Sequence, residues 1–234
     1  MPVTRNSNPE ITFATGERKR RARTRAAVLA LEGAAAADLR IAHALASRFD
    51  PAAFLVAVDG GIDTWRAVRR RPDLFVGDLD SATRAPRGIA SRIYPVEKDF
   101  SDFSGALDEA SLHGAAVVVI AGLLGGRLDH EWANLLEVGT AAPRFAGLLA
   151  PSARGLLAVT TAGLSARTTA GRLVSVFALG GGAKVTLRGT RWTLSKKRLT
   201  PGSLGLSNIA TGEVTLDVHE GVAGLVFPVA SVNA

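Results

Sequence analysis

The sequence predicts an α/β protein of two domains, a Rossmann-like domain with a mostly parallel sheet followed by an all-β sandwich. Residues 26–148 alternate short apolar runs with segments of helical spacing, as expected where helices connect parallel strands. Residues 149–234 instead show short alternating strands with glycine-rich separators and almost no helical period. With 234 residues and 47% apolar content, the chain can bury one large core or two modest ones.

The period of the apolar residues predicts the elements of the first domain. Apolar runs indicate strands at 26–31, 54–58, 74–76 and 117–120. Helical spacing indicates helices at 38–46, 102–113 and 128–138, and Ser101 is the expected N-cap of the second helix. Ligands of such sheets bind at the carboxyl ends of the strands. Polar motifs that follow these strands are therefore the first candidates for a functional site.

The second domain is predicted to consist of strands alone. Alternation indicates strands at 155–161, 173–179, 184–187, 213–218 and 222–227. The run Gly180-Gly181-Gly182 is expected to form a turn between two of them. Because no helix follows these glycines, we do not interpret them as a phosphate-binding loop.

The composition excludes several classes of site and of protein. The chain has no cysteine, which rules out disulfides, thiolate metal sites and cysteine nucleophiles, and is consistent with a cytoplasmic protein. Any metal must be held by oxygen or by one of four histidines. No apolar run approaches the length of a membrane span, and the run that follows Arg25 ends at Glu32, too early for a secretory signal.

The formal charge of +7 is concentrated at the N-terminus. The first 25 residues hold seven Arg or Lys against two Glu, so this segment carries +5 of the net charge. We expect residues 1–25 to form a disordered basic tail, which could touch the phosphates of a nucleic acid. The rest of the chain shows no interleaving of aromatic and basic residues typical of an RNA-binding surface.

The most informative motif is Gly77-Asp78-Leu79-Asp80-Ser81, which follows the apolar run at 74–76. It places two carboxylates, those of Asp78 and Asp80, two residues apart at a strand end, and the glycine permits close approach of the backbone. Carboxylate oxygens are hard ligands suited to Mg²⁺ bound to nucleotide phosphates. Asp-x-Asp pairs at surface turns are also common without a metal.

Two further acidic clusters follow comparable strands, which strengthens the metal interpretation. Asp59-Gly60-Gly61 comes after the strand at 54–58, and Lys98-Asp99-Phe100-Ser101-Asp102 comes after the apolar run at 93–96. Eight of the 21 acidic residues lie between Asp59 and Asp102, a density that needs a compensating cation. The alternative is that Asp59, Asp73 and Asp99 form turns or cap helices.

A fourth motif, Gly125-Gly126-Arg127-Leu128-Asp129-His130, lies between the strand at 117–120 and the next helix. Paired glycines at the start of a helix expose backbone N–H groups to an anion, and the Arg127 guanidinium can contact two phosphate oxygens at once. His130 is expected either to contact a nucleotide or to stabilise the turn.

The order of these motifs resembles the thiamine pyrophosphokinase family. The family has Asp-Gly-Gly, Gly-Asp-x-Asp-Ser, Lys-Asp-x-Thr-Asp and Gly-Gly-Arg-x-Asp-His, followed by a late Ser-Asn. The last of these corresponds here to Ser207-Asn208, and the resemblance runs from about residue 26 to the C-terminus. Each motif is short, but five in the same order with suitable separations are specific.

The resemblance implies a Mg²⁺-dependent enzyme that transfers the terminal diphosphate of ATP to the hydroxyl of thiamine, giving thiamine diphosphate and AMP. It implies Asp78, Asp80 and Asp102 as metal ligands, and these residues together with Asp59 and Lys98 as the catalytic set. Residues implied to bind ATP are Gly60, Gly61, Ser81, Ser101, Arg127, Asp129 and His130. Phosphoryl-type transfer depends mainly on charge neutralisation and positioning, which agrees with the lack of an evident Ser-His nucleophile pair.

The resemblance also implies a homodimer, because thiamine in this family lies between the catalytic domain of one subunit and the β domain of its partner. A flat cationic heterocycle favours an aromatic face and hydrogen-bond acceptors, which Trp192, Ser207 and Asn208 can supply. Ordinary core packing is the alternative for Trp192.

Four positions depart from the family pattern: Ser101 stands where threonine is usual, Ser104 where glutamate is common, and Ile62-Asp63 where Ala-Asn is usual. These departures bear on substrate choice more than on the nucleotide half. One alternative function is a related diphosphokinase acting on another primary alcohol, such as a hydroxymethylpterin. Another is a non-catalytic nucleotide- or RNA-binding protein whose aspartates only form turns.

Overall fold

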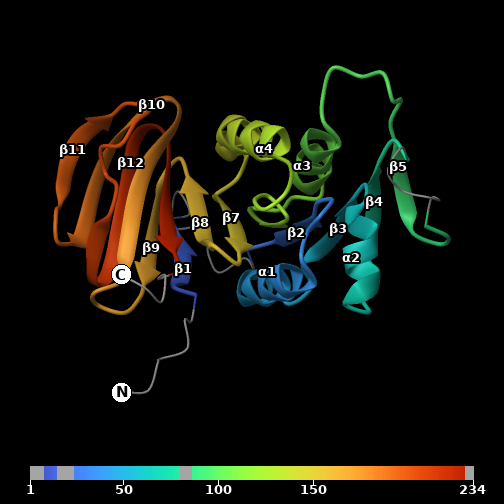
Figure 1. Cartoon of the computed structure of the whole chain (residues 1–234), viewed down its shortest axis with the longest axis horizontal. Coiled ribbons are helices and arrows are strands. Elements are labelled where there is room, and N and C mark those ends of the chain that lie inside the picture. Colours follow the sequence, from blue (N-terminus) through green and yellow to red (C-terminus); the bar gives the residue numbers. More distant parts are fainter. Residues whose placement is uncertain (1–7, 15–23, 80–85, 230–234) are drawn as a thin grey trace. The chain divides into compact units, whose positions relative to one another are not determined.

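The computed structural model describes residues 8–14, 24–79 and 86–229, and its contacts divide the chain into two units (Figure 1). The first unit is Lys19–Ser152, and the second combines Ala153–Ala234 with Met1–Arg18. The boundary therefore falls after Ser152 rather than after residue 148, and the N-terminal segment belongs with the C-terminal unit.

The first unit contains a sheet of six parallel strands. Its strands are β2 (Ala26–Ala30), β3 (Phe54–Val58), β4 (Leu74–Gly77), β5 (Ala90–Ile93), β6 (Val117–Ala121) and β7 (Gly147–Ser152). They are ordered β7-β6-β2-β3-β4-β5, and each neighbouring pair in this order is parallel. All residues of β2 and β6 are buried, which explains their continuous apolar sequences. The predicted parallel sheet is confirmed.

Helices cover both faces of this sheet (Figure 1). They are α1 (Ala36–Phe49), α2 (Gly61–Ala67), α3 (Asp102–Leu112) and α4 (Leu128–Ala141), the last followed by a 3₁₀ turn at Ala142–Arg144. Helices α1 and α2 lie on one face, and α3 and α4 on the other. Ser101 caps α3 as predicted, since its hydroxyl accepts a hydrogen bond from the Ser104 N–H at 3.0 Å.

The strand order reverses at β2, and this reversal creates the opening used by the site. The chain moves from β2 through β3 and β4 to β5 on one side, then returns to place β6 and β7 on the other side of β2. The connections after β2 and after β6 therefore leave in opposite directions, so a crevice forms at their carboxyl ends.

Two glycines of the predicted motifs are required by close packing. A Cβ on Gly61 would lie 1.9 Å from the carbonyl oxygen of Ala30, at the end of β2. A Cβ on Gly77 would lie 2.7 Å from Oδ1 of Asp59. Glycine at these positions lets the start of α2 approach β2, and leaves room for the Asp59 carboxylate beside the end of β4.

The second unit is all-β. Its strands are β1 (Glu10–Phe13), β8 (Gly155–Thr160), β9 (Gly163–Arg167), β10 (Leu173–Thr190), β11 (Leu194–Leu199) and β12 (Asn208–Pro228). The long strand β12 pairs antiparallel with β9 through Glu213–Asp217 and with β8 through Ala223–Pro228. Its opposite edge lies along β10, where Val176 faces Leu225 and Leu187 faces Leu216.

Two predictions for this unit were wrong. Residues 10–13, expected in a disordered tail, form β1, which pairs antiparallel with β9 and buries Ile11. The glycines at 180–182 are not a turn between separate strands, because β10 continues through them. Pairing with β12 passes from Leu179 opposite Val222 directly to Ala183 opposite Gly221, so the glycines form an irregularity within one strand.

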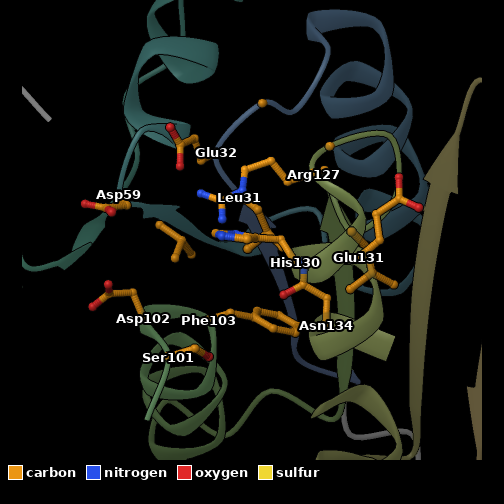
Figure 2. Close-up of a pocket in the computed structure, with 15 residues that line it drawn as sticks. Leu31, Glu32, Asp59, Ser101, Asp102, Phe103, Arg127, His130, Glu131 and Asn134 are labelled. Atoms are coloured by element: carbon orange, nitrogen blue, oxygen red, sulfur yellow. The ribbon is translucent and has the colours of Figure 1, made fainter. Parts of the chain in front are cut away.

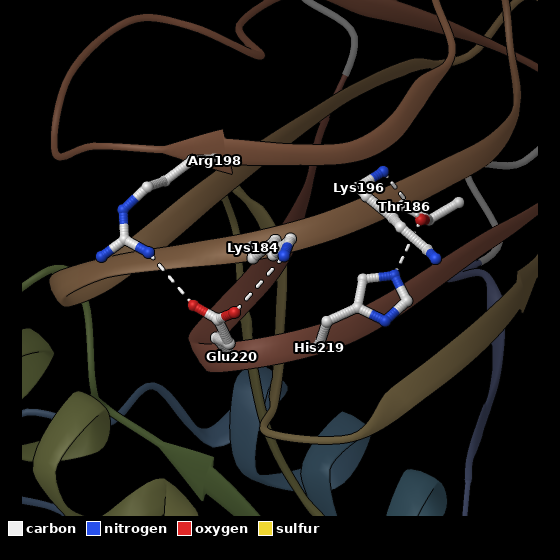
Figure 3. Close-up of polar contacts among 6 residues, drawn as sticks. All are labelled: Lys184, Thr186, Lys196, Arg198, His219 and Glu220. Atoms are coloured by element: carbon white, nitrogen blue, oxygen red, sulfur yellow. Dashed lines mark hydrogen bonds and ion pairs between the residues drawn. The ribbon is translucent and has the colours of Figure 1, made fainter.

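Polar side chains attach the edge strand β11 to β10 and β12 (Figure 3). The backbone of Lys196 is left-handed, with a φ of 44°, and its N–H donates to the hydroxyl of Thr186 at 3.1 Å. The same hydroxyl hydrogen-bonds Nε2 of His219 at 2.8 Å. Arg198 on β11 forms an ion pair with Glu220 on β12 at 3.1 Å. These contacts hold a strand whose other side chains are largely exposed.

Among the described residues, no helix is long and apolar enough to cross a membrane.

We predict that Gly61→Ala destabilises the protein by about 1–3 kcal/mol, because the new methyl group overlaps a backbone oxygen that cannot rotate away. Gly126→Ala is the matched control, since a Cβ there meets no atom within 4 Å. Urea denaturation of both variants measures the difference. Equal midpoints for the two variants would contradict the close approach.

Candidate functional site

A pocket of about 730 Å³ opens at the carboxyl ends of β2, β3 and β6, within the first unit (Figure 2). The residues after these strands form one side, and the first turns of α3 and α4 form the other. The lining residues are Leu31, Glu32, Gly33, Val58, Asp59, Ser101, Asp102, Phe103, Gly122, Leu123, Gly126, Arg127, His130, Glu131 and Asn134. The pocket lies where the reversal of strand order predicts a ligand site.

Three aspartates from separate elements converge beside this pocket. Asp59 follows β3, Asp78 follows β4, and Asp102 is the first residue of α3. Each offers a carboxylate oxygen, and these three oxygens lie within 4.8 Å of one another. Asp59 adopts a left-handed backbone with a φ of 49°, at the point where the chain turns from β3 into α2. The predicted convergence of acidic strand ends is therefore observed for these three residues.

Lys98 neutralises part of this acidic cluster. Its ammonium lies 2.6 Å from Oδ2 of Asp78 and 3.3 Å from Oδ2 of Asp102, and its side chain is only 8% exposed. Burial by itself lowers the pKa of Lys98, but the hydrogen bonds and negative charges of Asp78 and Asp102 outweigh it, so the pKa is raised. Lys98 is therefore a fixed cation at neutral pH.

The position of Asp102 depends on a contact between α3 and α4. The Ser101 hydroxyl accepts from the Ser104 N–H and donates to Oε2 of Glu137 on α4 at 2.7 Å. This pair of bonds fixes the Ser101 rotamer and the first turn of α3, to which Asp102 belongs. Sequence reasoning missed Glu137, because it lies 36 residues from Ser101 and belongs to no recognised motif.

The Gly125-Gly126-Arg127 segment forms the rim of the pocket before α4. Arg127 contacts Asp129 through two hydrogen bonds, of 2.7 and 3.2 Å. Arg127 donates both bonds to the Asp129 carboxylate. They lower the pKa of Asp129 and raise the pKa of Arg127, so both remain charged at neutral pH. The Gly125 N–H donates to the Glu131 carboxylate. Of the two glycine N–H groups expected to face an anion, that of Gly125 therefore has a partner within the chain.

The structure brings most of the predicted residues of the first unit together. Asp59, Ser101, Asp102, Arg127 and His130 line the pocket, and Lys98 and Asp78 adjoin it through the acidic cluster. Asp129 does not line the pocket itself, but it forms an ion pair with Arg127, which does.

Gly60 and Gly61 are not among the lining residues of the pocket, and both are closely packed. A Cβ on Gly60 would lie 2.8 Å from Cγ of Glu32, and Gly61 packs on Ala30. Asp80 and Ser81 lie outside the described residues.

Asp73 was given a turn or a helix cap as its alternative role, but its observed contact joins two strands: its Oδ2 accepts from the Leu55 N–H of β3 at 2.8 Å, just before β4 begins. Asp99 is exposed. Pocket residues that sequence reasoning missed include Glu32, Phe103, Glu131 and Asn134. Asn134 was within reach of prediction, because it follows His130 by four residues on α4 and so shares its face. Glu131, one residue after His130, was not predictable in this way.

The remaining predicted residues lie in the second unit. Trp192 stands in the turn between β10 and β11, and its side chain is 55% exposed, so it does not serve core packing. Asn208 begins β12, is buried, and hydrogen-bonds the backbone of Trp192 at both ends: Oδ1 accepts from its N–H at 3.1 Å, and Nδ2 donates to its carbonyl at 2.6 Å. Ser207 is exposed and left-handed, with a φ of 56°.

Two family models match the chain. The thiamin pyrophosphokinase catalytic domain matches residues 45–144, and the thiamin pyrophosphokinase vitamin B1 binding domain matches residues 163–223. Their order is that of the two units of the structure.

Solved structures share the fold. A thiamine pyrophosphokinase from Bacillus subtilis is similar with a TM-score of 0.72 at 19% identity, covering 88% of this chain and 100% of that one. One from Geobacillus thermodenitrificans has a TM-score of 0.70 at 23% identity, covering 89% and 100%. One from Candida albicans has a TM-score of 0.65 at 13% identity, covering 87% and 89%. No curated protein matches the chain.

We predict that Lys98→Met makes thermal stability dependent on a divalent cation. Without Lys98, the three carboxylates within 4.8 Å repel one another, so we expect the melting temperature to fall by several degrees and Mg²⁺ to restore it. Lys98→Arg, which keeps the charge, is the control. Thermal melts with and without Mg²⁺ are the measurement. A Mg²⁺ response no larger than that of the native protein would contradict the electrostatic role of Lys98.

Proposed function

The chain belongs to the thiamin pyrophosphokinase family, and from this premise we propose that Mg²⁺ and ATP bind at the pocket of its first unit. The enzyme is a transferase that forms thiamine diphosphate. The observation that carries the proposed nucleotide site is the meeting of Asp59, Asp78 and Asp102 beside a pocket with Arg127 at its rim.

The donor set fits Mg²⁺. This ion prefers oxygen ligands, keeps several waters, and is held in nucleotide enzymes by one or two carboxylates together with substrate phosphates. Carboxylate oxygens within 4.8 Å of one another, from three separate elements, meet that requirement with small side-chain movements. Asp78 and Asp102 are the proposed ligands. Asp80 is proposed as a third from its sequence position alone.

When bound, Mg²⁺ supplies charge neutralisation at the ATP phosphates. Lys98, fixed between Asp78 and Asp102, adds a permanent positive charge at the same place. Arg127 lines the pocket and can exchange its Asp129 carboxylate for a phosphate, because a phosphate, like a carboxylate, offers two oxygens to the planar guanidinium. Gly126, Ser101 and His130 are the proposed polar contacts to the nucleotide, and Leu31, Leu123 and Phe103 provide an apolar surface for the base.

The proposed reaction moves the two terminal phosphates of ATP as one group. The thiamine hydroxyl oxygen forms a bond to the β-phosphorus, the bond from that phosphorus to the oxygen shared with the α-phosphate breaks, and AMP leaves with that oxygen. The hydroxyl proton is released to solvent. Asp59 is proposed to orient the incoming hydroxyl or to order the metal site. Positioning and charge stabilisation account for the catalysis, since such transfers need little covalent help from the protein.

We propose that thiamine is held by the second unit of a partner subunit, with Trp192 and Ser207 among its contacts. Trp192 is 55% exposed, and the Arg191 guanidinium lies 5.1 Å from the centre of its ring, so the ring face opposite Arg191 is the one proposed to take the flat cationic ring. Leu204 and Leu206, in the segment before Ser207, are also exposed. The active form is accordingly proposed to be a cytoplasmic homodimer with two equivalent sites.

An unpartnered apolar face on α4 supports the dimer. Leu128, Trp132 and Leu136 recur every four residues and are 80%, 67% and 56% exposed. Three other residues of the same helix, His130, Glu131 and Asn134, line the pocket. A second copy of the chain that covers this face would therefore lie beside the nucleotide site.

We predict that Asp78→Asn lowers thiamine-dependent AMP formation by about 100-fold or more while the protein stays folded, because the variant loses a charged metal ligand. Asp108→Asn is the matched control, since Asp108 pairs with Arg144 away from the pocket. AMP release at saturating Mg²⁺ measures both variants, and circular dichroism checks their fold. Near-normal turnover by Asp78→Asn would remove Asp78 from the metal shell.

We predict that the double variant Trp132→Ser and Leu136→Ser shifts the protein to monomer and lowers activity in parallel. Both substitutions remove apolar area from the exposed face of α4. Leu112→Ser is the control, since Leu112 is 77% exposed at the end of α3 but lies outside that face. Sedimentation at assay concentration, combined with the AMP assay, provides the test. A fully active monomer would overturn the proposed assembly.

A further inference from the structure

Trp192 combines an exposed side chain with a firmly held backbone. It lies in the three-residue connection between β10, which ends at Thr190, and β11, which begins at Leu194. A large aromatic side chain that is 55% exposed at such a turn gains little stability from burial. Its backbone nevertheless receives more side-chain hydrogen bonds than a surface turn requires, which indicates that its position matters.

Asn208 provides most of these hydrogen bonds. Its Oδ1 accepts from the Trp192 N–H at 3.1 Å, and its Nδ2 donates to the Trp192 carbonyl at 2.6 Å. These two hydrogen bonds, one accepted and one donated, match those that the backbone of a paired strand residue would make with Trp192. The hydroxyl of Thr190 donates a further bond to the same carbonyl at 3.0 Å. Both residues are buried, so these bonds are protected from competition with water.

The side chain of Asn208 has little capacity left for a ligand. Its Oδ1 also accepts from the Ile209 N–H at 2.9 Å, so both lone pairs of this oxygen are engaged by backbone groups. The residue is 5% exposed. Asn208 was expected to supply a hydrogen-bond acceptor to thiamine, and these contacts argue for a different role.

We propose that Asn208 is a positioning residue: it holds the backbone of Trp192 so that the exposed indole is fixed in place for the thiamine ring, and it does not itself contact thiamine. The inference rests on the proposed role of Trp192 in thiamine binding. A preorganised aromatic face loses less freedom when a ligand stacks on it, so the effect of Asn208 should appear in thiamine affinity.

The variant Asn208→Asp separates positioning from direct contact, because the two roles predict changes of opposite sign. Aspartate keeps the two acceptor bonds but has no N–H for the Trp192 carbonyl, and it sets two oxygens against each other at that point. Positioning therefore predicts that the KM for thiamine rises about tenfold, with kcat and the KM for ATP within about twofold of native values. A direct acceptor role predicts an unchanged or lower KM, because a carboxylate attracts the thiamine cation.

A second readout needs no turnover. In a Trp132→Phe background the remaining tryptophans are Trp192 and Trp65, and Trp65 is fully buried. Acrylamide quenching of fluorescence then reports mainly on Trp192, and Asn208→Asp should increase the quenching and lower the fluorescence anisotropy. If the native protein formed no AMP with thiamine, the proposed function would fail, whereas this measurement would still test whether Asn208 holds Trp192.

Two further variants complete the experiment. Thr12→Val removes a hydrogen bond to Ser165 in the same unit that does not involve Trp192, and it should change neither readout. Thr190→Val removes one of the bonds to the Trp192 carbonyl, so it should raise quenching and the KM for thiamine by about two- to threefold. If Asn208→Asp does not fold, Thr190→Val is the variant on which the positioning role is tested. Unchanged quenching and KM in the variant that folds, or a lowered KM in Asn208→Asp, would overturn the proposal.

Discussion

Mutual repulsion among three carboxylates is the constraint on which the catalytic half depends. Asp59, Asp78 and Asp102 offer carboxylate oxygens within 4.8 Å of one another, so a nearby cation stabilises their arrangement. Lys98 supplies one positive charge and contacts two of the three aspartates. Lys98 thereby reduces the repulsion between them, and the proposed Mg²⁺ would reduce it further when bound.

The strand order explains why residues 43 positions apart in sequence can meet at this point. Asp59 and Asp78 follow neighbouring parallel strands, β3 and β4, so their turns open at the same edge of the sheet. Asp102 arrives from a different direction, at the start of α3, and its placement requires the Ser101 cap and the Glu137 contact with α4. The proposed metal site therefore combines a rigid part from the sheet with a part set by helix packing. Substitutions between α3 and α4 should affect it more subtly than loss of a carboxylate.

The sequence predicts the parts of the fold whose apolar residues are continuous, such as the fully buried strands β2 and β6. It places the strand before Lys98 at residues 93–96, whereas β5 is Ala90–Ile93, because every residue of β5 is exposed and gives no apolar signal. It does not predict β11, which carries three consecutive basic residues. Helix α2 was missed because it has only seven residues and begins at Gly61, which resembles a turn. The acidic cluster was predictable from strand ends, whereas the Glu131 contact to Gly125 depends on side-chain rotamers that a motif does not encode.

In the second unit, the two residues of the Ser207-Asn208 motif have different structural roles. Ser207 and Asn208 are adjacent in sequence, but Ser207 is exposed and left-handed whereas Asn208 is buried in backbone hydrogen bonds. The turn that carries Trp192 has no strand partner of its own at that position, so a side-chain amide supplies the missing pairing. A long flexible side chain would lose more entropy in that role than the short amide of asparagine. Asparagine at position 208 is thus explained by the local backbone, independently of which ligand stacks on the indole.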